Sequence, residues 1–171
     1  LASAWFCDQL HSPIGLEALE YLSKKRSLNK SSIQNFNLGY APDQWDGLLR
    51  HLKSVQGIST ELMQSAGLII PRKSGDGFYD RFRSRVIVPI VDRQRRVVGF
   101  GGRSLDNTEP KYLNSPETEI FDKSSILFGL DKAAKCIQKN DKAIVVEGYF
   151  DVISLHSFGI ENSVASLGTA L

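Results

Sequence analysis

The sequence predicts a fold of mixed α+β and α/β class, and three stretches of the chain support this prediction. The first seventy residues place apolar side chains at helical spacing, whereas short apolar runs separated by turn residues begin at Ser84. Near the end, an apolar run, a helical segment and a second apolar run follow one another. That order is typical of a β-α-β unit. We therefore expect a mixed helical and β segment followed by the start of a parallel sheet.

Three helices are expected in the first seventy residues. They begin after Pro13, Pro42 and Ser59, which are residue types that favour helix starts. Gly67 supplies the stop of the third helix. The expected buried faces comprise Leu16, Leu19 and Leu22 in the first helix, Trp45, Leu48, Leu49 and Leu52 in the second, and Leu62, Met63 and Ala66 in the third.

A β-hairpin is predicted next. Residues 86–91 and 97–101 are apolar runs of strand type, joined by the polar turn 92–95. Pro89 has no N–H to donate, so we expect it at a sheet edge or a bulge. The glycines of the second run do not open a helix and therefore do not form a dinucleotide-binding motif. Their expected use is close approach by another strand or by a ligand.

Residues 110–118 form a polar segment between two prolines, which cannot be a regular helix or a central strand. Lys111 can neutralise a phosphate, Tyr112 can stack on a base, and Asn114 can hydrogen-bond to sugar, base or phosphate. The segment therefore suits contact with a nucleotide or a nucleic acid. The alternative is a polar surface loop without such a role.

The predicted β-α-β unit, which a helix over residues 131–139 precedes, carries two acids. Glu147 follows the apolar run 143–146, which we expect to be a buried strand, and Asp151 lies at the expected start of the helix, where it suits a cap. Ligands collect at the carboxyl ends of strands in such sheets, so the pair predicts a metal site. The alternative is an ion pair between Glu147 and a neighbouring Lys or Arg. The helix is expected to bury Val152, Leu155 and Phe158 before the second run at 163–167.

The composition is that of an ordinary globular chain. Hydrophobic residues make up 42% and charged residues 23% of the 171 residues, and no apolar run reaches the ~20 residues that a membrane helix needs. The first residues lack the basic start of a signal peptide, so we expect an intracellular protein without a membrane partner. Cys7 and Cys136 are isolated, and so are the three histidines, which argues against a disulfide framework or a zinc ribbon.

The positive charge is concentrated in one segment. Residues 72–103 contain nine Arg or Lys against three acids, although the net charge of the whole chain is only +2. Such an excess is typical of a surface that binds a polyanion. The alternative is a solvated basic face without a partner.

Together these motifs resemble the RNA-polymerase domain, or catalytic core, of bacterial DnaG-type DNA primases. The resemblance covers nearly the whole chain and is specific, because several independent motifs occur in order. The motifs are residues 38–42, 79–90, 99–103, 110–118, 147–152 and 165–170.

The resemblance implies an N-terminal basic subdomain over residues 1–140 and the beginning of a TOPRIM (Rossmann-like) domain over 141–171. It implies template-directed synthesis of short RNA primers on single-stranded DNA from ribonucleoside triphosphates, by metal-dependent nucleotidyl transfer. The implied cofactor is Mg²⁺ or Mn²⁺ at the TOPRIM site. Zinc would belong only to a separate N-terminal module, and the replicative helicase would bind a C-terminal domain, both outside this chain. The implied location is the bacterial cytoplasm, at the replication fork.

The resemblance also implies roles for individual residues. Glu147 matches the catalytic acid of the family, and Asp151 accompanies it at the metal site. Six further residues match positions of the basic groove that holds template and nucleotide phosphates: Arg26, Arg103, Lys111, Tyr112, Asn114 and Lys123.

The chain departs from the family pattern at several positions. Arg95 and Ser27 stand where the family usually has Gly, and Ser124 and Ser125 stand where Gly and a basic residue are more common. In the family pattern, the Asp-x-Asp pair that completes a TOPRIM metal site comes after the position that Leu171 matches. The expectation is therefore a fragment of a larger enzyme that is inactive alone.

Two other functions remain open at this stage. A non-catalytic module that binds single-stranded DNA would explain the basic segment, and it would bind DNA equally with and without Mg²⁺. A primase-helicase that shares the TOPRIM fold would carry a downstream ATP-binding loop.

Overall fold

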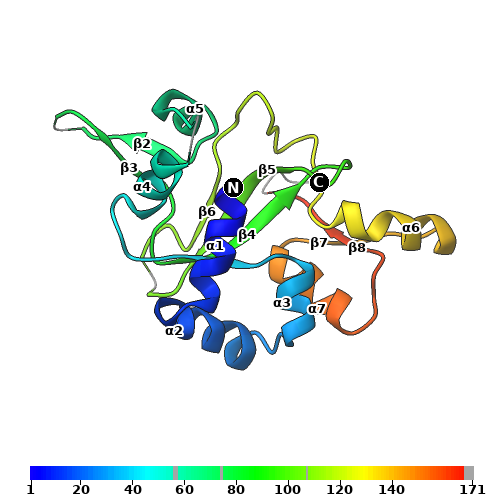
Figure 1. Ribbon diagram of the computed structural model, residues 1–171. Helices are drawn as coiled ribbons and strands as arrows, with labels where there is room; N and C mark the ends of the chain where they lie inside the picture. The colour runs from blue at the N-terminus through cyan, green and yellow to red at the C-terminus, as the bar shows by residue number, and fades with distance from the viewer. Residues whose placement is uncertain (56–57, 74, 107, 168–171) are drawn as a thin grey trace.

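The computed structural model of the chain describes residues 1–55, 58–73, 75–106 and 108–167. Figure 1 shows the strands β4 and β5 in the middle, α4, α5 and a small hairpin at one end, and α6, α7, β7 and β8 at the other. Residues 168–170 of the last family motif lie outside the described residues. The helices are α1 (Ala2–His11), α2 (Leu16–Glu20), α3 (Lys30–Asn35), α4 (Gly47–Ser54), α5 (Thr60–Ser65), α6 (Leu130–Asn140) and α7 (Tyr149–Ser157), with a 3₁₀ turn η1 (Pro13–Gly15) and a π turn η2 (Tyr21–Lys25) on either side of α2.

The three helices predicted before Ser84 are present, but three residues of their expected buried faces are exposed. Leu16 is 61% exposed because a spacing of three residues drifts around a helix of 3.6 residues per turn. Trp45, also 61% exposed, precedes α4 and is not on its face. Leu62 is 55% exposed because its neighbour Met63 occupies the side of α5 that faces the core.

The caps of the third predicted helix are as expected. The Ser59 hydroxyl accepts the N–H of Leu62 at the start of α5. Gly67 follows the helix with a φ of +67°, a left-handed conformation that glycine adopts at low cost.

The predicted hairpin is the centre of a four-stranded antiparallel sheet in the order β1-β4-β5-β6. Pro89 lies in an internal strand, yet β1 pairs only with residues 85–87, so among the described residues position 89 has no strand partner on that side. A register shift follows between Ile90 and Val91. Pro89 therefore lies on a locally unpaired edge of β4 and next to an irregularity in the β4–β5 pairing, as expected. The strands are β1 (Gly39–Ala41), β4 (Arg85–Val91), β5 (Val97–Ser104) and β6 (Tyr112–Asn114).

Two glycines of β5, which pair with residues of β6, also make room for aromatic side chains. A Cβ at Gly101 would lie 2.6 Å from the ring of Tyr149, and a Cβ at Gly102 would lie 2.9 Å from the ring of Phe82. Contacts this short do not occur, so a larger residue at Gly101 would displace the Tyr149 ring. The β5 backbone thus positions a residue of the C-terminal unit.

A buried carboxylate holds α4 in place. The side chain of Asp80, at the end of the hairpin β2 (Ile69–Pro71) and β3 (Phe78–Asp80), accepts the backbone N–H groups of Leu48 and Leu49 at 2.7 and 2.9 Å. The Asp46 side chain at the N-cap of α4 makes no such bond. Asp80 therefore satisfies the free donors at this helix start from a distant strand.

The predicted β-α-β unit is present, with parallel strands β7 (Ile144–Val146) and β8 (Ser163–Ala165) joined through α7. Three details of the prediction were wrong. Asp151 does not cap α7, because the N-cap is Gly148 and Asp151 lies within the first turn. Phe158 is 78% exposed after the end of the helix. Val145 is 44% exposed, because in the described residues β7 pairs with β8 alone and one face is open.

One hydrophobic core crosses from the antiparallel sheet to the β-α-β unit. Val86 and Val88 of β4 belong to the same buried cluster as Phe150 and Val152 of α7 and Ala165 of β8. A continuous hydrophobic core therefore joins the antiparallel sheet and the β-α-β unit. Among the described residues, no helix is long and apolar enough to cross a membrane.

We predict that Asp80→Ala lowers the free energy of unfolding by roughly 2–4 kcal/mol, because two buried N–H groups lose their acceptor. Urea denaturation measures this change. The control is Asp8→Ala, which removes an exposed carboxylate of α1 and should change stability by less than about 0.5 kcal/mol. Equal effects of the two substitutions would show that Asp80 does not hold α4.

Asp80 also predicts a pH dependence. Burial outweighs the two N–H bonds and the nearby Arg83 and raises the pKa of Asp80 from 3.8 to about 6. The folded state thus binds more protons than the unfolded state between these values, and stability from this group falls as the pH rises from 3.8 to about 6. Asp80→Asn should remove this slope from a series of denaturation curves. A slope that persists unchanged in the variant would assign it to other groups.

Candidate functional site

A pocket of about 260 Å³ lies where the C-terminal ends of β7 and β8 meet the edge strand β6. Four residues that the sequence singled out line it. Glu147 and Asp151 come from the β-α-β unit, and Tyr112 and Asn114 come from β6. The pocket thus joins the two parts of the chain, and its remaining walls are Gly148, Tyr149, Ser166 and Leu167.

The two acids of the pocket are placed by consecutive elements. Glu147 directly follows β7, and Asp151 lies in the first turn of α7, and both side chains are exposed. A Cβ at Gly148 would lie 2.9 Å from Oδ2 of Asp151, so the glycine leaves room for this carboxylate. The described residues contain no group of three or more His, Cys, Asp or Glu side chains that could hold a metal ion. Two carboxylates nevertheless fit Mg²⁺, which commonly takes one or two of them and completes its shell with water and phosphate oxygens.

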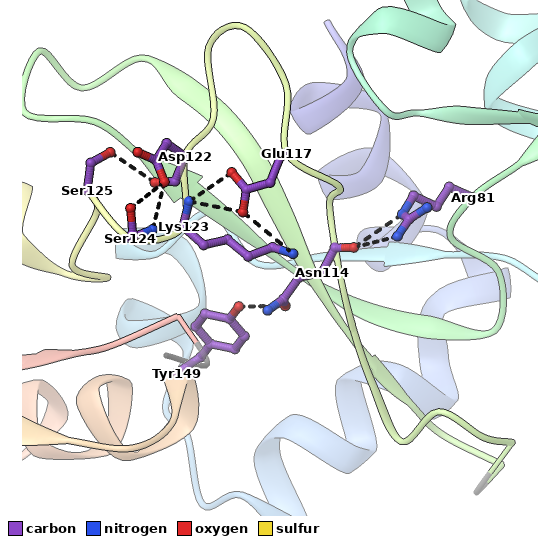
Figure 2. Close-up of polar contacts among 8 residues, drawn as sticks. All are labelled: Arg81, Asn114, Glu117, Asp122, Lys123, Ser124, Ser125 and Tyr149. Carbon is purple, nitrogen blue, oxygen red and sulfur yellow. Dashed lines mark hydrogen bonds and ion pairs between the residues drawn. The ribbon is translucent and has the colours of Figure 1, made fainter. Parts of the chain in front are cut away.

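Asn114 is fixed from two sides, as Figure 2 shows. The Nε and Nη2 atoms of Arg81 donate to its backbone carbonyl at 3.2 and 2.9 Å. The hydroxyl of Tyr149 donates to its side-chain Oδ1 at 2.6 Å. A residue of the segment between β3 and β4 and a residue of α7 thus meet on the same asparagine.

Two arginines surround Tyr112 beside the pocket. Arg26 donates from Nη2 to the Tyr112 hydroxyl at 3.2 Å and from Nε to the Tyr21 hydroxyl at 2.8 Å. The guanidinium of Arg103 lies 5.1 Å from the centre of the Tyr112 ring. The Arg26 guanidinium also covers the ring of Phe150 at 4.5 Å. These contacts concentrate positive charge and hold it in defined positions.

Arg103 has an unsatisfied donor. Its side chain is only 9% exposed, and its Nη1 donates to the carbonyl of Ser104. Its buried Nε has no hydrogen-bond partner in the part of the chain that the structure describes. Leaving a buried guanidinium N–H without an acceptor is costly, so an anionic acceptor for the Arg103 side chain would stabilise this arrangement.

Arg26 has a reinforced charge. Burial lowers its pKa, but the hydrogen bonds and proximity of the Tyr21 and Tyr112 hydroxyls outweigh burial and raise the pKa above its ordinary value. Arg26 therefore carries its full positive charge at neutral pH.

The two lysines predicted at the groove lie apart from the pocket walls. Lys111 is exposed, and the carbonyl of the preceding Pro110 accepts from Nη1 of Arg85 at 2.7 Å. The ammonium of Lys123 lies 4.0 Å from the carboxylate of Glu117, which also accepts the Lys123 backbone N–H (Figure 2). The structure thus brings six of the eight predicted residues together, namely Arg26, Arg103, Tyr112, Asn114, Glu147 and Asp151.

Sequence reasoning missed three residues of the site. Arg81 and Tyr149 lie inside the recognised motifs 79–90 and 147–152, but nothing in their spacing indicated that both bind Asn114. Tyr21 lies outside every motif, and no sequence signal marked it. Part of the basic segment 72–103 also makes contacts within the chain, because Arg81 and Arg85 donate to backbone carbonyls.

The positions where the chain departs from the family pattern keep a glycine-like or turn geometry. Arg95 and Ser27 have φ values of 63° and 54°, the left-handed conformation that glycine adopts most easily. The turn containing Arg95 closes through its N–H to the carbonyl of Asp92. Ser124 donates from both its backbone N–H and its hydroxyl to the Asp122 carboxylate, and the Ser125 hydroxyl donates to the Asp122 carbonyl (Figure 2). The two serines thus close the turn that precedes the helix α6.

Comparison with known proteins identifies the family. The family described as DNA primase catalytic core, N-terminal domain, matches residues 5–134, and the Toprim domain matches residues 141–171. The chain is 55% identical to the DNA primase of Synechococcus elongatus over all of its 171 residues, and 43% identical to that of Escherichia coli over 98% of its length. It spans 25% and 28% of the length of these two relatives.

Solved structures agree with this match. The RNA polymerase domain of Mycobacterium tuberculosis primase DnaG, in complex with a double-stranded DNA that has a 6-nucleotide overhang, superposes with a TM-score of 0.91 at 40% identity, over 99% of this chain and 53% of that one. A DnaG primase catalytic domain bound to single-stranded DNA gives 0.86 at 42% identity, over 98% and 51%. The chain therefore belongs to the family of DnaG-type DNA primase catalytic cores.

Proposed function

We propose that this chain forms part of a primase catalytic core that synthesises short RNA primers on single-stranded DNA from ribonucleoside triphosphates. The observation that carries the proposal is the pocket itself, in which two carboxylates face a tyrosine and an asparagine flanked by two arginines. Carboxylates suit a divalent metal and arginines suit phosphates, and phosphoryl transfer needs both in one place. The relatives of known structure include complexes with single- and double-stranded DNA.

Glu147 and Asp151 are the residues that would hold Mg²⁺, or Mn²⁺, as Toprim domains generally do. When bound, the metal would activate the attacking 3′-hydroxyl and stabilise the leaving pyrophosphate. Arg26 and Arg103 would neutralise nucleotide or template phosphates, since both are held beside the pocket by tyrosines. Lys111 would meet the template at the exposed end of β6, and Lys123, once released from Glu117, would add charge to the groove.

The wider setting follows from the same proposal. Residues 1–140 would be the basic subdomain and residues 141–171 the beginning of the Toprim domain. The partners would be the template, the nucleotides, the RNA primer and a replicative helicase, at a bacterial replication fork. A zinc-binding module would be a separate part of the same protein. A DNA-binding module without catalysis is the second candidate, favoured by the presence of only two acids among the described residues of the pocket.

We predict that Glu147→Gln abolishes primer synthesis and leaves DNA binding intact. The change keeps the size of the side chain but removes the charge that would hold the metal, so the rate of ribonucleotide incorporation should fall at least ~100-fold. The assay uses the full-length protein with a single-stranded template, and fluorescence anisotropy measures template affinity.

The matched control is Glu161→Gln, an exposed glutamate between α7 and β8 that should leave incorporation unchanged. Retained synthesis in Glu147→Gln would contradict the catalytic proposal. Absence of synthesis in the wild type, together with salt-sensitive DNA binding that does not depend on Mg²⁺, would favour the DNA-binding module.

We predict that Lys111→Ala weakens template binding and lowers the slope of log affinity against log salt by about one, because one phosphate contact is lost. The exposed Lys139→Ala at the end of α6 is the control and should leave the slope unchanged. A slope for Lys111→Ala equal to that of the wild type would place Lys111 outside the template path.

A further inference from the structure

The side-chain amide of Asn114 has a defined orientation. Its Oδ1 accepts the Tyr149 hydroxyl at 2.6 Å, and its backbone is held by Arg81. Its Nδ2 donates to no atom of the described residues, although Asn114 lines the pocket that contains Glu147. An amide whose oxygen is already bonded to a donor has only its two N–H groups left to offer a ligand.

Tyr149 is well suited to impose this orientation because its ring cannot move freely. The side chain is only 8% exposed and packs edge-on against Phe128, with ring centres 5.0 Å apart. The ring also lies against Gly101 of β5, which pairs with Asn114 of β6. The strand that pairs with Asn114 therefore also makes room for the ring that reaches it.

We propose that Tyr149 is a positioning residue: its hydroxyl holds the Asn114 amide so that the two amide N–H groups face a phosphate oxygen bound in the Glu147 pocket. The inference rests on the proposed function. It assigns to the bound anion a hydrogen-bond donor in addition to the two arginines. Because Tyr149 and Glu147 are two residues apart in the sequence, the same short segment would position both the carboxylate of Glu147 and the side-chain amide of Asn114.

The ligand oxygen could belong to the incoming triphosphate or to the template backbone. Two probes distinguish them in the full-length protein: the KM for ATP with Mg²⁺ during primer synthesis, and the Kd for a single-stranded oligonucleotide without nucleotide. Tyr149→Phe removes one hydroxyl and keeps the packed ring. We expect it to raise the KM for ATP roughly 2- to 10-fold with little change in kcat if the oxygen is on the nucleotide, or to raise the oligonucleotide Kd by that factor if it is on the template.

A double-mutant cycle separates positioning from a general loss of structure. Asn114→Ala should have the larger effect, and Tyr149→Phe should add nothing when Asn114 is already Ala, because its only route to the ligand is gone. Asn114→Asp keeps an acceptor for Tyr149 but loses the N–H donors, so it should impair the same constant as Asn114→Ala. Tyr40→Phe, which changes another buried tyrosine in β1, is the control and should alter neither constant.

Additive effects of Tyr149→Phe and Asn114→Ala would overturn the inference, as would unchanged KM and Kd in Tyr149→Phe. Either result leaves the proposed function standing as long as the wild type makes primers and Glu147→Gln does not. Failure of the wild type to make primers would count against the proposed function instead. The Kd for ATP with Mg²⁺, measured by calorimetry, still tests the positioning role in that case.

Discussion

The joining of the two parts of this chain depends on the burial of one aromatic ring, that of Tyr149. The ring fits only because β5 has a glycine at position 101, and it closes against Phe128, whose backbone pairs with Ala165 of β8. Phe128 also stacks on Phe36, which follows α3. Antiparallel sheet, helical segment and β-α-β unit thus meet at one aromatic contact, and the pocket forms at its polar edge.

This arrangement explains why the site combines residues so distant in sequence. The acids follow from the β-α-β unit, since Glu147 sits at the end of a parallel strand and Asp151 in the next helical turn. The arginines belong to the other part, and tyrosines fix them: Tyr112 lies between Arg26 and Arg103 at the edge of the sheet. A site built in this way separates the two kinds of charge, with carboxylates on one side and guanidinium groups on the other.

Much of this could be predicted from the sequence, because local patterns are strong here. The hairpin, the β-α-β unit and the placement of Glu147 follow from apolar runs and turn residues. The errors occurred where a pattern did not decide burial: Leu16 and Leu62 have helical spacing but face solvent, and Val145 is exposed on a strand expected to be buried. Local patterns also indicated four residues of the site, namely Tyr112, Asn114, Glu147 and Asp151, whereas Arg26 and Arg103 came from the family resemblance alone.

The sequence could not show which basic residues form hydrogen bonds to other parts of the same chain. Arg81 and Arg85 contribute to a segment that looks like a polyanion surface, yet each holds a backbone carbonyl of the segment 110–114. Asp80 similarly serves a helix that begins thirty-odd residues earlier, which no local motif encodes. Such contacts depend on tertiary proximity and carry no spacing signal.

The central claim is that the pocket binds a divalent metal on its acidic side and nucleotide phosphates on its basic side. The most direct measurement is a crystal structure of the full-length protein with Mn²⁺ and ATP, in which anomalous scattering locates the metal. We expect a manganese peak at the carboxylates of Glu147 and Asp151, with phosphate oxygens between the metal and Arg103. A peak elsewhere, or ATP bound with no contact to these residues, would contradict it.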